Sequence, residues 1–336
     1  MPRSPSRQAP APRPVHGGTD SMPDPRYDFS SNANALGPCP SVLAAVRNAV
    51  LTHYPDPLYA HLRDTLAAHH RTTPDRIVVG AGASELILRS IRCIEGAVQQ
   101  LAPTFSEYAH GARLAGRRLI SARSPAAFLR AQKEHPGIGF VCWPNNPTGD
   151  VWPLDFLAAA AAAGPLVVDM AYAPLCDVPL AGALEAAAAK AYRLYSPNKA
   201  FGLTGIRAAY LITPRIDRRM ASSAPSWVIG RDAVAFLEAV CRPQARAWLE
   251  QSLPRLQRWR GRLAGSLRGL GLPVRESPAT FLLARVGEAT RISLHLRSRG
   301  VRVRDASSFG LRQWIRLSAQ PPVAQKALLA ALEKAL

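Results

Sequence analysis

Apolar and polar residues alternate in two patterns through the first two thirds of the chain. Helical spacing of apolar positions predicts helices over residues 41–52, with Ser41 at the N-cap, and over roughly residues 59–70. Short apolar runs separate further helical stretches; these strand candidates read IVVG, QQLAPTF, GIGFVCWP and PLVVDMAY. Strands that alternate with helices in this way predict an α/β fold with a mainly parallel sheet between helices.

The last third of the chain has a different pattern. After Leu211 come long helical stretches that carry many arginines, then shorter strand candidates and a final helix from about Ala324 to Leu336. The strand candidates in this part read TFLLARV, RISLHL, GVRVRD and QWIRLSA. The change of pattern predicts a second, smaller α+β lobe.

We therefore expect two unequal domains and two N-terminal segments. Residues 1–14, rich in Pro, Arg, Ser and Ala, lack the apolar core of a secretory signal and are expected to form a disordered leader. Residues 15–45 are expected to join the small domain, residues 46–215 to form the large domain, and residues 216–336 to form the small C-terminal domain.

The chain of 336 residues has a net charge of +19, which raises the alternative of a nucleic-acid-binding protein. Its arginines, however, are spread along amphipathic segments, with no glycine-aromatic signature and no cysteine-histidine finger. The longest apolar region, residues 156–175, is interrupted by Gly164, Pro165 and Asp169. We expect a solvated basic surface, and neither a nucleic acid nor a membrane as partner.

Cysteine usage bears on the compartment and on metal binding. The five cysteines are scattered, odd in number and without a Cys-x-x-Cys pair. This distribution favours a reducing, cytoplasmic setting and predicts no structural metal site.

A glycine-rich loop follows the first strand of the predicted sheet. In VVGAGASE, the residues from Gly80 to Ser84 lie between a strand and a helix, where free backbone N–H groups favour a phosphate. A dinucleotide fold requires a third glycine and an acidic residue at the end of the next strand. Here Glu85 replaces that glycine, and the next strand, QLAPTF, ends without an acidic residue. A phosphate other than that of NAD is the functional interpretation, and a tight turn without a ligand is the alternative.

Three further motifs lie at later strand ends. WPNNPTG follows one strand, Asp169 ends the next, and Lys199 lies in SPNKAFGLTGIR, although the chain has only five lysines. Each motif also has an interpretation without function: WPNNPTG as a turn, Asp169 as a helix cap and Lys199 as a solvated lysine. Because the motifs occur in order at successive element boundaries, where ligand sites of parallel sheets lie, we interpret them as one site.

With these motifs the chain resembles the class I/II aminotransferase family, enzymes of fold type I that use pyridoxal 5'-phosphate. GAGASE, PTFSEY, WPNNPTG, VVDMAY, SPNKAFGLTGIR and WIRLS match family blocks in order from about Asp28 to the C-terminus. The resemblance implies a large domain with a seven-stranded, mainly parallel sheet, a smaller α+β domain and a homodimer. Met170 and Ala209 depart from the family pattern at positions remote from the reacting atoms.

The resemblance also implies roles for residues of this chain. Lys199 would form the Schiff base with the cofactor, and Asp169 would pair with its pyridinium nitrogen, which lets the ring accept electrons from the substrate Cα. Tyr172 would complete the catalytic set and, with Asn146, contact the ring hydroxyl.

The remaining implied contacts surround the same small molecule. Tyr108 would stack on the cofactor ring, with Phe105 as the less favoured alternative, and Tyr54 would reach the cofactor phosphate across the dimer interface. Within one protomer, that phosphate would be held by Ala83, Ser84, Ser196 and Arg207.

The substrate is implied to be a small, phosphorylated amino acid. Arg316 would hold its carboxylate through paired hydrogen bonds, Asn32 would contact it, and His16 would bind its phosphate. Two subfamilies fit: threonine-phosphate decarboxylases of cobalamin biosynthesis and histidinol-phosphate aminotransferases. The stretch VHGGTD near the N-terminus favours the decarboxylase, and amino transfer to a 2-oxo acid is the alternative.

Overall fold

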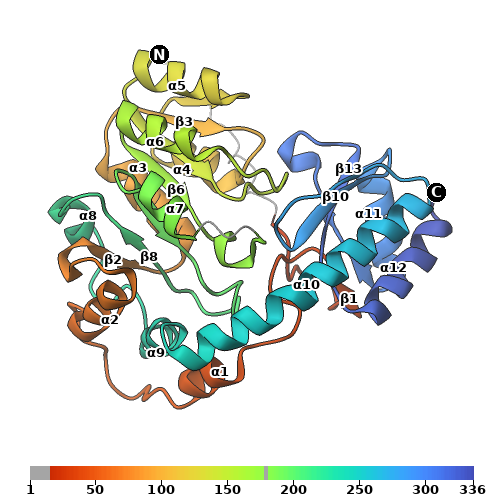
Figure 1. Ribbon diagram of the computed structural model, residues 1–336, viewed down its shortest axis with the longest axis horizontal. Coiled ribbons are helices and arrows are strands. Elements are labelled where there is room, and N and C mark those ends of the chain that lie inside the picture. The colour runs from red at the N-terminus through yellow and green to blue at the C-terminus, as the bar shows by residue number, and fades with distance from the viewer. Residues whose placement is uncertain (1–15, 178–180) are drawn as a thin grey trace, which may run out of the picture.

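The computed structural model describes residues 16–177 and 181–336, so the expected leader lies outside the described residues. Figure 1 shows two lobes, with the long helix α10 (Pro243–Gly269) running across both. The helices and strands of the larger lobe surround one extended sheet.

The large sheet has seven strands in the order β2-β8-β7-β6-β5-β3-β4. Only β8 runs antiparallel to its neighbours, so the predicted mainly parallel sheet is confirmed. The strands are β2 (Ile77–Gly80), β3 (Ala97–Leu101), β4 (Leu119–Ala122), β5 (Gly137–Cys142), β6 (Leu166–Asp169), β7 (Tyr192–Tyr195) and β8 (Ala209–Ile212).

Helices cover both faces of this sheet because its central strands are apolar on both sides. Successive residues of β5, Phe140 and Val141, belong to two different core clusters, one on each face. On one face pack α2 (Ala60–His70), α3 (Ala83–Cys93), α4 (Ser106–Leu114) and α9 (Arg231–Val240). The other face is covered by α5 (Pro125–Glu134), α6 (Leu154–Ala163) and α7 (Ala181–Ala187). Continuous apolar strands of this kind are typical of parallel sheets.

The first helix differs from its prediction at both ends. Helix α1 spans Pro40–Arg47, and its N-cap is Cys39 rather than Ser41. Pro40 occupies the first helical position, where its missing N–H costs nothing. The helix ends at Arg47, five residues before the predicted end at Thr52, and residues 50–58 form an exposed segment that connects it to α2.

The small lobe contains an antiparallel sheet in the order β12-β13-β10-β9. The strands are β9 (Val274–Arg275), β10 (Phe281–Arg285), β12 (Arg304–Asp305) and β13 (Trp314–Ser318), with α11 (Ala289–Ser298) and α12 (Pro322–Glu333) beside α10. The N-terminal segment joins this lobe through β1 (Tyr27–Asp28), which pairs with β11 (Val301–Arg302). A short helix, α8 (Arg218–Ser222), packs on α3 and β2 of the large lobe.

The stretch RISLHL is a helix, and its predicted strand is wrong. Ile292 and Leu296, four residues apart, are buried, whereas Leu294 between them is 64% exposed. The alternation of apolar residues predicts a strand, but only Ile292 and Leu296 contact the core. Their spacing of four residues is that of a helix face.

The core clusters bear on the division into domains. Phe236 of α9 and Leu256 of α10 belong to the large-lobe core, whereas Leu263 and Leu267 of α10 belong to the small-lobe core. We therefore propose that the boundary lies within α10, later than residue 215.

Candidate active site

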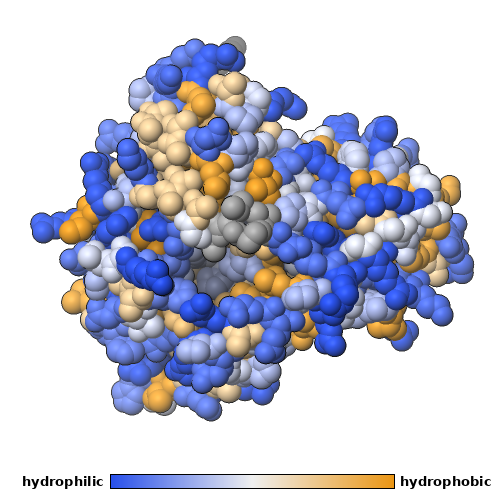
Figure 2. All heavy atoms as spheres, in the orientation of Figure 1, coloured by the Kyte–Doolittle hydropathy of each residue, from blue (hydrophilic) through white to orange (hydrophobic). Residues whose placement is uncertain are grey.

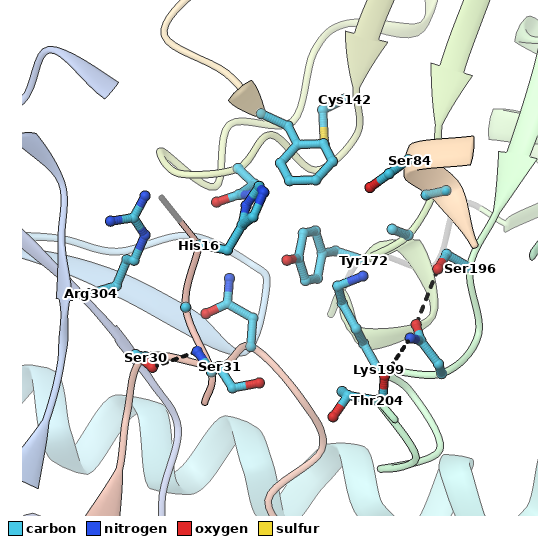
Figure 3. Close-up of a pocket in the computed structure, with 18 of the residues that line it drawn as sticks. His16, Ser30, Ser31, Ser84, Cys142, Tyr172, Ser196, Lys199, Thr204 and Arg304 are labelled. Carbon is cyan, nitrogen blue, oxygen red and sulfur yellow. Dashed lines mark hydrogen bonds between the residues drawn. The ribbon is translucent and has the colours of Figure 1, made fainter. Parts of the chain in front are cut away.

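Loops at the carboxyl ends of the large-sheet strands meet the small lobe around one cavity of about 430 Å³. The loops after β2, β3, β5, β6 and β7 all contribute, together with the N-terminal segment and strands β12 and β13. Figure 3 shows side chains from both lobes around this cavity. Its volume is in the range of small-molecule sites, and its position is the one expected for a parallel sheet.

Lys199 extends into the cavity from the loop that joins β7 to β8 (Figure 3). The loop is held by a backbone hydrogen bond from the Asn34 N–H to the Lys199 carbonyl at 2.9 Å and by the Ser196 hydroxyl bonded to Asn198 at 3.1 Å. The Nζ atom lies 5.4 Å from the centre of the Tyr172 ring. Burial lowers the pKa of Lys199, and the charge of Asp169 partly opposes that shift.

Asp169 is the last residue of β6 and lines the same cavity. Its Oδ2 accepts a hydrogen bond from the Tyr108 hydroxyl at 2.8 Å, and its Oδ1 accepts one from the Ala171 N–H at 3.0 Å. Burial raises the pKa of Asp169, while these two hydrogen bonds and the charge of Lys199 act in the opposite direction. A buried carboxylate and a buried amine therefore face one cavity.

An anion-binding cradle lies where α3 begins. Ala83 and Ser84 form the first turn of this helix and line the cavity with Ser196 and Arg207. Gly82 precedes them with φ +89°, and a Cβ there would lie 2.6 Å from the Arg207 Nη2 atom. The positive φ favours glycine at this position, and a Cβ there would displace the end of the Arg207 side chain. Free N–H groups at the helix N-terminus and a nearby arginine can hold a phosphate.

Arg316 on β13 lies between the two lobes. Its Nη1 donates to the Asn146 side-chain oxygen, and its Nη2 donates to the Ser30 carbonyl at 2.7 Å. Its Nε is buried without a hydrogen-bond partner. The buried Asn32 side chain interacts with the Tyr172 hydroxyl. Since buried polar groups are nearly always paired, the Arg316 Nε indicates a polar ligand in the cavity.

Arg304, which the sequence analysis missed, also lines this end of the cavity. Strand β12 pairs with β13 so that Arg304 lies opposite Arg316, and burial lowers the pKa of Arg304 to about 10. Its Nη2 donates to the Ser308 hydroxyl at 2.7 Å. The sequence feature that could have identified Arg304 is its position on a predicted strand, between Val303 and Asp305 and two residues after Arg302.

The His16-Gly17-Gly18 segment crosses this end of the cavity. His16 Nε2 lies 2.9 Å from the Glu107 carboxylate of α4, and the Gly18 N–H donates to the Ser30 hydroxyl at 2.9 Å. A Cβ on Gly17 would lie 2.2 Å from the Ser30 carbonyl oxygen, so no larger residue fits there. Gly17 lets the chain pass closely over Ser30, Gly18 adopts a positive φ, and His16 lines the cavity.

Two predicted cofactor residues do not line the cavity within this chain. Tyr108 is fully buried behind it and stacks on Phe140, whereas Phe105, the less favoured alternative, does line it. Tyr54 is 74% exposed and stacks on Trp227 at the surface. The other predicted residues line one cavity: Ala83, Ser84, Asn146, Asp169, Tyr172, Ser196, Lys199, Arg207, Arg316, His16 and Asn32.

This arrangement fits pyridoxal 5'-phosphate. An amine and a carboxylate lie in one cavity with the start of α3, where a glycine of positive φ lies against Arg207. The unpaired Nε of Arg316 would gain a partner from a polar ligand.

The surface adds little to this interpretation. On the face drawn in Figure 2, hydrophilic residues cover both lobes and hydrophobic residues form small groups. Within the described ranges, no helix is both long and apolar enough to cross a membrane.

Comparisons with known proteins identify the family of this chain. The model of the family "Aminotransferase class I and II" matches residues 25–334. Histidinol-phosphate aminotransferase from Ruegeria pomeroyi is 32% identical over 311 residues, which cover 86% of this chain and 85% of the relative.

Solved structures have the same architecture. Histidinol-phosphate aminotransferase from Sinorhizobium meliloti, in complex with pyridoxal-5'-phosphate, gives a TM-score of 0.81 at 25% identity, with 92% of this chain and 91% of that chain covered. L-threonine-O-3-phosphate decarboxylase from Porphyromonas gingivalis gives a TM-score of 0.80 at 22% identity, with 91% and 98% covered, and supports the fold alone. With the family model, the relatives and the cavity in agreement, the chain belongs to the class I and II aminotransferase family.

Proposed function

We propose that this protein transfers the amino group of a phosphorylated substrate, of the histidinol-phosphate type, to a 2-oxo acid. The protein is an enzyme of the aminotransferase family, and its cofactor is pyridoxal 5'-phosphate. The names of its relatives support amino transfer over the decarboxylation that the sequence analysis favoured. The proposal includes the identity of the substrate, the roles of the residues in the cavity and a homodimer.

Each side chain would act on the cofactor or on a proton. The bound cofactor supplies an aldehyde for amine exchange and a ring that accepts an electron pair from Cα. Lys199 would hold the cofactor covalently and, once displaced by the substrate amine, move the proton at Cα. Asp169 would keep the ring nitrogen protonated, Asn146 and Tyr172 would orient the ring hydroxyl, and Phe105 would take the stacking position in place of Tyr108.

The observation that carries the choice of substrate is the pair of buried arginines on neighbouring strands. Arg304 and Arg316 lie opposite each other on β12 and β13, and both line the cavity with His16. They are additional to Arg207, which lines the cavity with Ala83 and Ser84. A guanidinium binds a carboxylate or a phosphate through paired hydrogen bonds, which suits a phosphorylated amine and a dicarboxylic 2-oxo acid in turn.

Decarboxylation of threonine phosphate is the second candidate. The position of His16 favours it, because the Gly17-Gly18 segment brings this residue to the wall of the cavity. Threonine phosphate would present a carboxylate to Arg316 and a phosphate to Arg304 and His16 at the same time. The two reactions differ in which Cα bond stands perpendicular to the cofactor ring. The contacts with Arg316, Arg304 and His16 would hold the substrate but do not determine that orientation.

One assay separates the two reactions. The enzyme is incubated with histidinol phosphate plus 2-oxoglutarate, and separately with threonine phosphate, and glutamate and carbon dioxide are measured. We expect glutamate from the first mixture; carbon dioxide from the second would establish the second candidate instead, and neither product would refute both. Lys199→Ala should abolish the product, whereas the matched Lys190→Ala, at an exposed position outside the cavity, should not.

A homodimer is part of the proposal. Large apolar side chains are exposed along residues 50–58 and at Trp227, where an apolar surface of this kind suits a partner protomer. Arg231 donates to the His53 carbonyl at 3.0 Å, and Trp227 Nε1 donates to the Pro55 carbonyl at 3.1 Å. These contacts hold the segment in place, so Tyr54 would be presented to the cofactor phosphate of the partner.

A further inference from the structure

The hydroxyl of Tyr108 is a buried group that the proposed function does not use. It donates to Asp169 Oδ2 at 2.8 Å, and the side chain has no exposed surface. The ring is held on two sides, stacked on Phe140 with centroids 4.8 Å apart and in edge contact with Phe105 at 5.8 Å. The hydroxyl therefore has a fixed direction, toward the carboxylate.

The titratable side chains that interact with Asp169 come from four elements of the large lobe. Tyr108 comes from α4, Cys142 from β5, Tyr172 from the loop after β6, and Lys199 from the loop after β7. Burial raises the pKa of the Cys142 thiol and of both tyrosines, so at neutral pH all three are uncharged. The charge of Lys199 favours the ionised form of Asp169.

A buried carboxylate stays ionised through nearby positive charge and through the hydrogen bonds donated to it. Of the two hydrogen bonds on Asp169, the one from the Ala171 N–H is fixed by the backbone, and the one from Tyr108 comes from a side chain. Hydrogen bonds that donate to the charged form favour it against the cost of burial.

We propose that Tyr108 is a positioning residue, whose hydroxyl orients the Asp169 carboxylate and keeps it ionised so that this carboxylate can hold the cofactor ring nitrogen protonated. The inference rests on the role proposed for Asp169. It gives Tyr108 a function behind the cofactor ring rather than on its face, and it explains why a tyrosine, with a hydroxyl directed at Asp169, stacks on Phe140.

The test is Tyr108→Phe, which keeps the ring and removes only the hydroxyl. Pyridoxal 5'-phosphate is titrated into the apoenzyme, and its dissociation constant is measured across pH. Loss of one hydrogen bond to a charged group predicts about tenfold weaker binding. That hydrogen bond lowers the pKa of Asp169. Its loss should therefore raise the pH at which cofactor affinity begins to fall as the solution is acidified.

Two comparisons make the result specific. Tyr210→Phe removes a buried hydroxyl from β8, where it lies 2.8 Å from His70 Nε2, and should change neither the affinity nor its pH profile. In an Asp169→Asn background, Tyr108→Phe should have less than about a twofold effect, since the hydroxyl acts through the charged carboxylate.

The proposal is overturned if folded Tyr108→Phe binds the cofactor with wild-type affinity and pH profile, or if its loss is equally large in the Asp169→Asn background. Thermal melting of each apoenzyme establishes that the variants are folded. The readout is cofactor binding, not turnover. The proposed amino transfer could therefore fail in its own assay while the result for Tyr108 stands.

Discussion

Lys199 is a buried amine whose charge is controlled by its neighbours. Burial lowers its pKa, and the negative charge of Asp169 raises it. Since the neutral amine is the nucleophile, the protonation of this residue governs how fast the apoenzyme takes up its cofactor covalently.

This balance predicts a pH dependence. The rate at which borohydride-fixed cofactor appears in apoenzyme should rise with pH, with a midpoint below the value of about 10.4 for a free lysine. Asp169→Asn removes the charge that raises the pKa of Lys199, so the midpoint should move further down. Asp75→Asn, at an exposed position paired with Arg63, should leave it unchanged. A midpoint that moves up in Asp169→Asn would contradict the proposed coupling.

At the scale of single elements, the turn from β2 into α3 is the segment on which the phosphate site depends. Gly82→Ala would place a Cβ against Arg207 and force a positive φ on alanine. We expect the cofactor to bind at least about tenfold more weakly, with a lower melting temperature. Gly37→Ala is the matched control, because Gly37 also has a positive φ but no atom lies within 4 Å of the new Cβ. It should lower the melting temperature alone; equal cofactor affinity in both variants would refute the assignment.

The sequence predicted most of the elements of the large lobe because their apolar runs are long and bounded by turns. It failed for α11, where ISLHL fits a strand as well as a helix until packing selects Ile292 and Leu296. It also favoured Tyr108 over Phe105, two aromatic residues three positions apart at the start of one helix. Which of them meets the cavity depends on how α4 lies against the sheet, and local patterns do not encode that.

At the scale of the whole molecule, the motifs predicted the cavity well because each follows a strand end. Parallel strands bring their carboxyl ends together, so order along the chain became proximity in space. Arg304 was missed because its position depends on the pairing of β12 with β13, a register that only the folded small lobe defines.

The proposed dimer gives a prediction at this scale. Leu51→Asp places a charge in the exposed apolar surface and should yield monomers by analytical ultracentrifugation. Tyr54→Phe should weaken cofactor binding severalfold in the dimer, since it removes one hydrogen bond to a charged group. The Leu51→Asp monomer should bind the cofactor more weakly than the dimer, and adding Tyr54→Phe to it should not weaken cofactor binding further. A wild-type monomer with full cofactor affinity would refute the shared site.

The place of β8 in the sheet has a consequence for how the enzyme is made. This strand pairs with β2 on one side and β7 on the other, although β2 is synthesised much earlier (Figure 1). The turn into α3 and the loop that carries Lys199 are therefore joined in one sheet only when the chain has been translated through Ile212. In a nascent chain that lacks β8, the turn into α3 and the Lys199 loop would not yet be joined through one sheet. Because a ligand stabilises only the state that binds it, pyridoxal 5'-phosphate would rescue late folding defects but not chains that stop short of β8.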